Sequence, residues 1–158
     1  MDHSNTVVRA VIDPARRREI AADVLHDLPD WFGIPESTRA YIEESGELPF
    51  FAAHRAGEPI GFLTVRRTSR CAAEIHVMGV KRASHRGGTG RALVDAAIAF
   101  CRENGYRLLQ VKTLDERHPD LGYAQTRRFY EAVGFLPLEC FPTLWDEDNP
   151  CLVMVMPL

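Results

Sequence analysis

The most informative stretch of the chain is Ser84-His85-Arg86-Gly87-Gly88-Thr89-Gly90-Arg91-Ala92-Leu93, which joins an apolar run, residues 75–80, to an amphipathic segment typical of a helix. Three glycines in four residues allow positive φ angles and remove the Cβ atoms that would keep a ligand from the backbone. The first N–H groups of a helix lack partners within it, and the peptide dipoles place positive charge there. A strand, a glycine-rich turn and a helix start therefore predict an anion site, to which Arg86 and Arg91 add formal charge.

Two common phosphate-binding motifs are absent from this stretch. It has no Gly-Lys-Ser/Thr ending, and the spacing of Gly87, Gly88 and Gly90 does not give Gly-x-Gly-x-x-Gly. Nucleotide hydrolysis and dinucleotide binding are therefore disfavoured. A glycine-rich turn that merely lets a strand pass into a helix is the alternative interpretation of the same residues.

Composition and charge limit the class of protein. A length of 158 residues suits a single domain over residues 1–158, and 46% hydrophobic with 26% charged residues is typical of a soluble globular protein. The formal charge of −3 and the isoelectric point near 6.1 lack the basic excess that binding to a phosphate backbone needs. No nucleic-acid partner is therefore predicted, whereas a small cationic acceptor remains open.

The four cysteines are scattered, with no Cys-x-x-Cys pair and no histidines at zinc-ligand spacing, which predicts reduced thiols and no metal. The first six residues lack a basic region followed by an apolar run, so no signal peptide is predicted. No apolar stretch approaches the roughly 18 residues of a membrane span. We therefore expect a cytoplasmic protein without a membrane partner.

The first half of the chain predicts one strand, two helices and a hairpin. The first helix begins at Asp13-Pro14, an N-cap followed by a proline at the first helical position. Apolar residues recur along it at helical spacing, and a glycine-containing turn joins the hairpin strands. The predicted ranges are 7–12 for the strand, 14 to about 28 and about 36 to 44 for the helices, and 49–55 and 59–67 for the hairpin.

The second half predicts two helices and four strands. A strand over 71–80 completes a three-stranded meander, and the helix over 89–104 leads to a strand over 108–113. A strand reached through a helix is normally parallel to the strand before it, so the sheet is predicted to be mixed. A polar loop, 114–122, a helix, 124–133, and two strands, 135–141 and 152–156, around a loop, 144–150, complete the chain.

Two segments of the chain resemble the GCN5-related N-acetyltransferase (GNAT) family. The acetyl-CoA loop of that family reads Gln/Arg-x-x-Gly-x-Gly/Ala; Gly88 and Gly90 match it, and His85 stands at its first position. The segment Arg128-Phe129-Tyr130-Glu131-Ala132-Val133-Gly134-Phe135 is similar to the family's Phe-Tyr-Glu-x-x-Gly-Phe, with Tyr123 where an Asn usually precedes the tyrosine by seven residues. The predicted order of helices and strands is also that of the family, so the resemblance covers the whole chain.

The resemblance implies an α/β (α+β) fold: a mixed, mostly antiparallel sheet of six to seven strands flanked by about four helices. It implies an enzyme that moves an acetyl group from acetyl-CoA to a primary amine by direct transfer in a ternary complex. A non-catalytic acyl-CoA-binding regulatory or interaction domain is the alternative. A toxin that acetylates charged tRNA is a third class, which the acidic balance of the chain weakens.

The resemblance also implies how acetyl-CoA is held. Backbone N–H groups of the glycine loop would bind the diphosphate, and the strand before the loop would pair with the pantetheine. A backbone N–H near Met78 to Val80 would stabilise the carbonyl oxygen as it gains charge. The implied cofactor-binding residues are Met78, Val80, His85, Arg86, Gly87, Gly88, Thr89, Gly90, Arg91 and Tyr123.

Catalytic roles follow from the same resemblance. The family motif places the Tyr130 hydroxyl near the thioester sulfur, where it would protonate the leaving thiolate; packing in the core is the alternative. Glu74 lies where several GNAT enzymes carry a glutamate that accepts the amine proton, unless it is an ordinary strand-edge charge. His76 shares its face of the strand. It is a second candidate base, since a histidine can accept a proton near neutral pH, and a candidate substrate-binding residue; a histidine with its hydrogen bonds satisfied within the protein is the alternative.

Aromatic residues supply the candidate acceptor site. Trp31 and Phe32 lie on the irregular connection between the first two helices, which often forms one wall of the acceptor site in this family; buried packing is the alternative. Trp145 precedes three acidic residues, an arrangement that suits a cationic amine unless it is simply solvated. The acceptor, a small amine or a protein amine, is left open. So is a homodimer, which many relatives form through their C-terminal strands.

Overall fold

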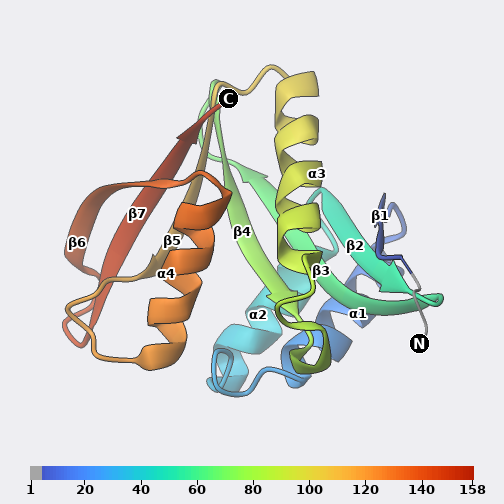
Figure 1. Ribbon diagram of the computed structural model, residues 1–158, viewed down its shortest axis with the longest axis horizontal. Coiled ribbons are helices and arrows are strands. Elements are labelled where there is room, and N and C mark those ends of the chain that lie inside the picture. The colour runs from blue at the N-terminus through green and yellow to red at the C-terminus, as the bar shows by residue number, and fades with distance from the viewer. Residues whose placement is uncertain (1–4) are drawn as a thin grey trace. The chain divides into compact units, whose positions relative to one another are not determined.

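The computed structural model describes residues 5–158, which form seven strands and four α-helices (Figure 1). The first four residues, on which part of the signal-peptide prediction depends, lie outside the described residues. In chain order the structure contains β1 (Val7–Ala10), α1 (Pro14–His26), α2 (Pro35–Ser45), β2 (Phe50–Arg55), β3 (Glu58–Arg67), β4 (Ala72–Val80), the 3-10 helix η1 (Arg82–Ser84), α3 (Thr89–Glu103), β5 (Leu108–Leu114), α4 (Leu121–Val133), β6 (Leu136–Asp146) and β7 (Asn149–Pro157).

All seven strands belong to one sheet, in the order β1-β2-β3-β4-β5-β7-β6. β4 pairs with β5 in parallel, whereas the pairs β1–β2, β2–β3, β5–β7 and β7–β6 are antiparallel. The parallel pair is the one reached through α3, as the rule for strand–helix–strand connections requires. The predicted mixed, mostly antiparallel sheet is therefore confirmed, with seven strands and four α-helices in the predicted order.

The chain forms two compact units. The first runs up to Arg66 and includes Ile75–Phe100, and the second consists of Arg67–Glu74 and Cys101–Leu158. β4 and α3 each contribute residues to both units. That the chain acts as a single domain stays a prediction.

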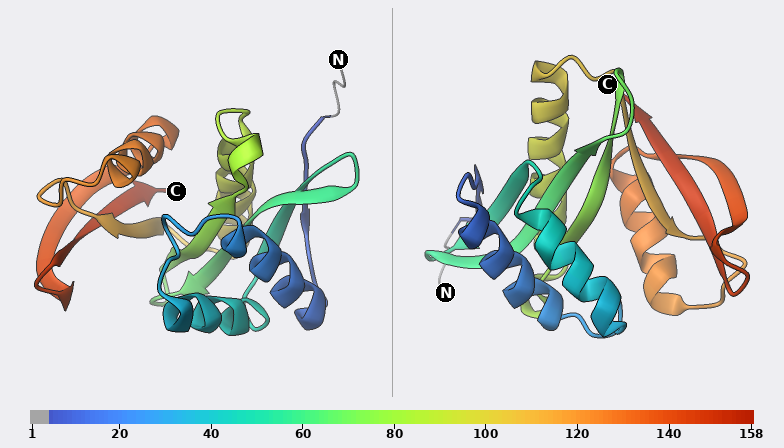
Figure 2. Two further views of the ribbon diagram at one scale, coloured as in Figure 1. Left: turned by 90° about the horizontal axis from the view of Figure 1, so that it is seen from below. Right: turned by 180° about the vertical axis from the view of Figure 1, so that it is seen from behind.

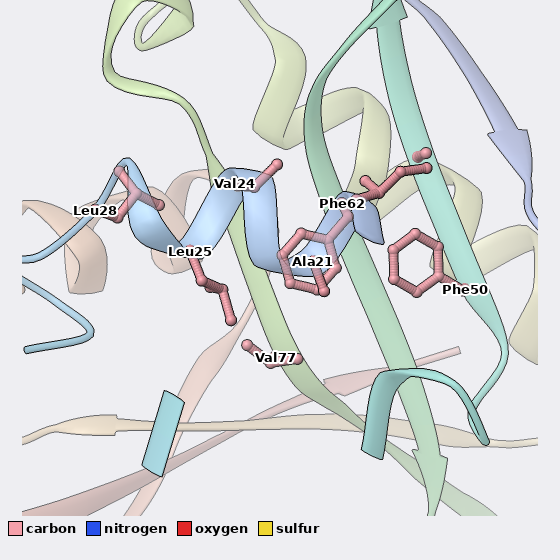
Figure 3. Close-up of a cluster of buried hydrophobic side chains, with 9 residues drawn as sticks. Ala21, Val24, Leu25, Leu28, Phe50, Phe62 and Val77 are labelled. Carbon is pink, nitrogen blue, oxygen red and sulfur yellow. The ribbon is translucent and has the colours of Figure 1, made fainter. Parts of the chain in front are cut away.

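The core of the first unit lies under α1 (Figure 3). One stripe of this helix is buried at helical spacing, as the sequence predicts, and includes Val24 and Leu25. The stripe packs on strand residues from β2, β3 and β4, and the rings of Phe50 and Phe62 are stacked with their centroids 5.2 Å apart. The members of this buried cluster are Ile20, Ala21, Val24, Leu25, Leu28, Phe50, Ala52, Phe62 and Val77.

Helix α3 covers the other face of the first unit's strands (Figure 2). Leu93, Val94 and Ala97 on its inner side are fully buried. A Cβ on Gly61 of β3 would lie 2.9 Å from the Gly79 carbonyl oxygen and 3.3 Å from a Leu93 methyl group. Glycine at position 61 is therefore needed for the close packing of β3 against β4 and α3.

In the second unit, α4 begins earlier than predicted. The Asp120 side chain accepts a hydrogen bond from the Tyr123 N–H at 3.0 Å, so the helix begins at Leu121 rather than Ala124. Gly134 ends it in the left-handed region, with φ of 115°. The sequence predicts a polar loop over 114–122, but Asp120 within that range is the N-cap of the helix.

The predicted loop over 144–150 is wrong. β6 continues to Asp146 and β7 begins at Asn149, and these two residues are paired across a tight turn. Asp146 Oδ1 accepts hydrogen bonds from the Asp148 N–H and the Asn149 side-chain amide, each at 2.9 Å. An aspartate that bonds to the backbone two residues later stabilises such a turn, so the acidic residues extend the hairpin instead of interrupting it.

Candidate functional site

The predicted anion site is formed by the connection between β4 and α3 in the first unit. Arg86 and Gly88 both have positive φ angles, 63° and 83°, which turn the backbone sharply before the helix. The first hydrogen bond of α3 runs from the Ala92 N–H to the Gly88 carbonyl at 3.0 Å. The N–H groups of Thr89 and Gly90 precede this bond, which leaves them at the positive end of a 15-residue helix.

His85 fixes the loop. Its ring nitrogen Nε2 donates to the Val80 carbonyl at 2.6 Å, and the ring meets the edge of Trp31 at a centroid distance of 5.9 Å. The Arg82 N–H donates to Asp27 Oδ2 at 2.9 Å, which attaches η1 to the end of α1. The His85 side chain therefore holds the loop to the end of β4, and Trp31 packs against the loop.

The basic residues that precede His85 are already paired. Lys81 forms an ion pair with Asp23 at 2.6 Å, and Arg82 pairs with Asp30. The Arg82 guanidinium also lies 5.8 Å from the centre of the Trp31 ring. These two cations therefore tie the loop to α1 and the segment after it, and their charge is balanced within the protein.

Thr89 carries an unsatisfied hydroxyl at the start of α3. The residue is 1% exposed, and its Oγ1 has no hydrogen-bond partner anywhere in residues 5–158. A buried hydroxyl without a partner is costly and rare. A Cβ on Gly88 would meet nothing within 4 Å, so the backbone there faces open space. The turn thus combines an orphan hydroxyl, helix N–H groups and an open approach, and it can bind a phosphate group.

A second cluster in the first unit surrounds His76 of β4. Its Nε2 is hydrogen-bonded to Glu44 of α2, and its side chain is 11% exposed while that of Glu44 is 49% exposed. The ring meets Tyr41 at 5.6 Å, and Tyr41 in turn meets Phe32 at 6.0 Å. The structure thus brings together His76 and Phe32, which the sequence analysis singled out separately.

Glu44 is a residue that sequence analysis missed. It lies in the last turn of α2, 32 positions before His76, and no local pattern links the two. A glutamate at the end of a helix is ordinarily read as solvated. The pairing arises because α2 packs over β4, which only the tertiary structure shows.

Tyr130 lies in the second unit, on the last turns of α4. It is 8% exposed, and its ring packs against Phe129 and Phe135 at 5.5 and 5.6 Å. Burial, and to a smaller extent the nearby Tyr123 phenol, raises the pKa of Tyr130 well above its ordinary value. The hydroxyl therefore keeps its proton throughout the physiological range.

Glu74, also in the second unit, is 3% exposed, and its Oε1 accepts from Lys112 Nζ at 3.1 Å. Gln110 of β5 lies opposite Glu74 in the parallel ladder, and Lys112 is two residues further along β5. A buried charge of this kind needs such a partner. The Lys112 partner was missed because it comes from the neighbouring strand, whose register the sequence does not give.

The remaining predicted site residues are placed as follows. Met78 and Val80 are half-buried on β4, and Arg86, Gly87, Gly88 and Arg91 are exposed around the start of α3. Trp145 is 47% exposed on the edge strand β6. The ligand contacts of all these residues stay predictions.

Within residues 5–158 there is no cluster of three or more His, Cys, Asp or Glu side chains arranged to hold a metal ion. None of the helices in this part of the chain is both long and apolar enough to cross a membrane.

Comparison with known proteins places the chain among acetyltransferases. The sequence profile of the Acetyltransferase (GNAT) family matches residues 10–135. A GNAT-family protein of known structure from Desulfovibrio desulfuricans has a TM-score of 0.83 at 20% identity, with 97% of this chain and 99% of that chain covered. An aminoglycoside 6′-N-acetyltransferase complexed with coenzyme A has a TM-score of 0.74 at 19% identity, covering 96% of both chains.

A third structure, a GNAT family acetyltransferase from Elizabethkingia anophelis with acetyl-CoA bound, has a TM-score of 0.71 at 15% identity and covers 98% of this chain and 99% of that chain. No curated protein sequence matches this chain. At these identities the structural likeness shows the fold, and the family profile shows the family.

The protein belongs to the GNAT family of acetyltransferases. The resemblance predicted from the glycine loop and the Tyr130 segment is therefore confirmed, as is the predicted fold. The predicted class of enzyme, an N-acetyltransferase, is also confirmed.

Proposed function

We propose that this protein transfers the acetyl group of acetyl-CoA to a primary amine, by direct attack in a ternary complex. The observation that supports this most strongly is the start of α3, where helix N–H groups, the open backbone at Gly88 and the orphan Thr89 hydroxyl meet. Such a site is suited to a diphosphate. Because the chain belongs to an acetyltransferase family, we infer that this diphosphate is the one in acetyl-CoA.

The glycine loop would hold the donor. The N–H groups of Gly88, Thr89 and Gly90 would bind the diphosphate, and the Thr89 hydroxyl would gain the partner that it lacks within residues 5–158. Met78 and Val80 of β4 would contact the pantetheine through their backbones. When bound, acetyl-CoA supplies an activated acetyl group as a thioester, so the protein has only to hold, align and move protons.

We assign the base to His76, held by Glu44. The hydrogen bond between His76 Nε2 and the Glu44 carboxylate fixes the orientation of the imidazole, and the carboxylate would stabilise the ring once it carries the amine proton. Glu74 is the second candidate, but the Lys112 ammonium group already engages one of its carboxylate oxygens. To take up the amine proton Glu74 would have to weaken its ion pair with Lys112, whereas a proton on His76 would strengthen its pairing with Glu44.

We assign the proton donor to Tyr130. Tyr130 would donate its phenolic proton to the CoA sulfur, which would leave with the electron pair of the broken carbon–sulfur bond as the amine nitrogen bonds to the acetyl carbon. The raised pKa keeps this proton in place before reaction. It also makes the phenol a weaker acid, so the transfer depends on a direct hydrogen bond from the hydroxyl to the departing sulfur.

The acceptor is proposed to be a primary amine, on a small molecule or a protein. Phe32 and Tyr41 provide aromatic surface beside the Glu44–His76 pair, and the exposed carboxylate of Glu44 attracts a cation. Trp145, exposed on β6, is kept as a further candidate contact. One structural neighbour is an aminoglycoside acetyltransferase, which makes aminoglycosides a reasonable first group of acceptors to test.

The remaining proposals concern assembly and location. We propose a single acetyltransferase domain that works in the cytoplasm without nucleic acid, and the net charge of −3 supports the last point. A homodimer through β6 is supported by exposed apolar side chains on this edge strand, among them Leu136, Leu138 and Leu144.

An acceptor screen with detection of the released CoA thiol tests the function. The panel would contain aminoglycosides, polyamines, amino acids and peptides with free amines, each with acetyl-CoA. We expect thiol release with at least one class of amine. Binding of acetyl-CoA without turnover on any amine would instead favour the non-catalytic acyl-CoA-binding domain.

A further inference from the structure

Arg55 lies beside the glycine loop, although no sequence motif links the two. It is the last residue of β2, whose arrowhead in Figure 1 points in the same direction as that of β4. The Lys81 N–H donates to the Ile60 carbonyl at 2.8 Å, which holds the chain after β4 against the start of β3. The end of β2 and the loop after β4 therefore meet at one edge of the sheet, within the first unit.

The guanidinium of Arg55 is directed toward the loop. A Cβ placed on Gly87 would lie 3.4 Å from Arg55 Nη2, so any larger side chain at position 87 would press on this group. The same nitrogen donates a hydrogen bond to the Thr6 hydroxyl at 3.1 Å. The side chain is half-buried and held at one end, which lowers the entropy lost when it binds a ligand.

The charge of Arg55 is not balanced by any residue from 5 to 158. Within the described part of the chain no carboxylate forms an ion pair with it, in contrast to Lys81 and Arg82 in the same region, which pair with Asp23 and Asp30. A guanidinium presents several donors in a planar fork that matches phosphate oxygens. An arginine of this kind beside an anion site is therefore suited to bind the anion.

We propose that Arg55 binds a phosphate of the CoA donor and selects donors that carry phosphate over thioesters that lack it. This inference rests on the proposed function, because it names a further contact of the same donor site. The sequence analysis did not find Arg55 because it lies 30 residues or more before the loop, at the end of a predicted hairpin strand.

Isothermal titration calorimetry of the full chain with acetyl-CoA tests the proposal. In Arg55→Gln we expect the Kd to rise about tenfold, the effect of losing one charge-assisted contact. Arg55→Lys keeps the charge but loses the planar guanidinium, so its Kd for acetyl-CoA should lie between those of the wild type and Arg55→Gln. Arg39→Gln, which removes an exposed arginine of α2, is the matched control and should bind like the wild type.

Activity with a second donor gives an independent readout. Arg55→Gln should lower kcat/KM for acetyl-CoA about tenfold and leave kcat/KM for S-acetylpantetheine, which has no phosphate, unchanged. Equal acetyl-CoA affinity in the wild type and Arg55→Gln, or equal losses with both donors, would overturn the role of Arg55 alone. No binding of acetyl-CoA to the wild type would overturn the proposed donor and the role of Arg55 together. If Arg55→Gln does not fold, wild-type affinity in Arg55→Lys would still contradict the proposal.

Discussion

The two helices at which the family motifs lie, α3 and α4, differ in how each begins. Before α4, the Asp120 carboxylate accepts from the Tyr123 N–H, so the protein caps its own helix. Before α3, the turn contains glycines and a strained Arg86, and the buried hydroxyl of Thr89 has no partner among the described residues. The start of α4 is therefore satisfied by a side chain of the protein itself, whereas the start of α3 keeps a buried hydroxyl without a partner within residues 5–158. Under the proposed function, the α3 connection would bind the donor, and Tyr130 of α4 would protonate the leaving thiolate.

The strongest test of this division is Tyr130→Phe. Loss of general acid catalysis typically costs about 10²-fold or more, so we expect kcat to fall by about 100-fold while the Kd for acetyl-CoA changes less than about twofold. Tyr106→Phe, which removes a phenol from the second unit outside the proposed site, is the control. Full activity in Tyr130→Phe would contradict the proposal that Tyr130 donates a proton to the leaving thiolate.

Gly88→Ala should disable the other connection. The Cβ would occupy the open side of the turn at a φ of 83°, where the donor has to approach, and we expect about 100-fold weaker binding of acetyl-CoA, equivalent to about 2.7 kcal/mol. Gly105→Ala is a close match, because Gly105 also has a positive φ, 78°, and open space around it. Both variants should lose about 1 kcal/mol of stability, and only Gly88→Ala should lose affinity. Similar affinities for the two variants would contradict a donor site at Gly88.

The buried face of α3 holds this helix in the protein, and Cys101 lies on that face. The pH dependence of stability therefore reports on the burial of Cys101. Burial raises the pKa of Cys101 from 9.0 to about 11. Because the folded pKa is the higher one, the stabilisation is complete below pH 9 and is lost as the pH rises toward 11. We expect urea unfolding to show a loss of about 2 kcal/mol over this range that is absent in Cys101→Ala. If the free energy of unfolding depends on pH identically in the wild type and in Cys101→Ala, burial does not raise the pKa of Cys101.

Thr89→Val separates binding from stability at one position. Valine keeps the shape and removes the unsatisfied hydroxyl, so stability should stay equal or rise, while affinity for acetyl-CoA falls by up to about tenfold. Thr113→Val, at the other buried threonine whose hydroxyl lacks a partner in the described residues, gives the stability reference. Unchanged affinity in Thr89→Val would mean that this hydroxyl does not bind the donor.

The smallest effect is expected at the capped helix. Asp120→Ala removes the side-chain cap of α4 and should lower the free energy of unfolding by about 1 kcal/mol, measured by urea denaturation. Asp120→Asn, which can accept the same hydrogen bond, should recover most of the loss. No change in Asp120→Ala would show that α4 does not depend on its cap.

Much of the fold was predictable because its signals are local. The Asp13-Pro14 start of α1, the apolar stripe through Val24 and Leu25 and the glycine loop before α3 each depend on neighbouring residues, and the structure has all three. The loop predicted over 144–150 was wrong because the polar residues there stabilise a turn between paired strands. Polarity alone does not distinguish a hairpin turn from a longer loop.

The site was less predictable because its contacts join distant segments. Glu44 meets His76, Lys112 meets Glu74 and Arg55 reaches the glycine loop across 30 or more positions of sequence, through helix packing and strand register. The two motifs identify the segments that contain the candidate donor-binding and catalytic residues. They do not reveal which partners position, neutralise or supplement the residues in those segments.

The central claim is that the first N–H groups of α3 bind the diphosphate of the donor. A titration with CoA followed by ¹H–¹⁵N correlation NMR tests it directly, because each backbone amide reports separately. We predict that the amides of residues 87–90 show the largest shifts in the glycine loop and saturate with one CoA per chain. If CoA binds and these amides do not shift, or if no amide shifts at millimolar CoA, the claim is contradicted.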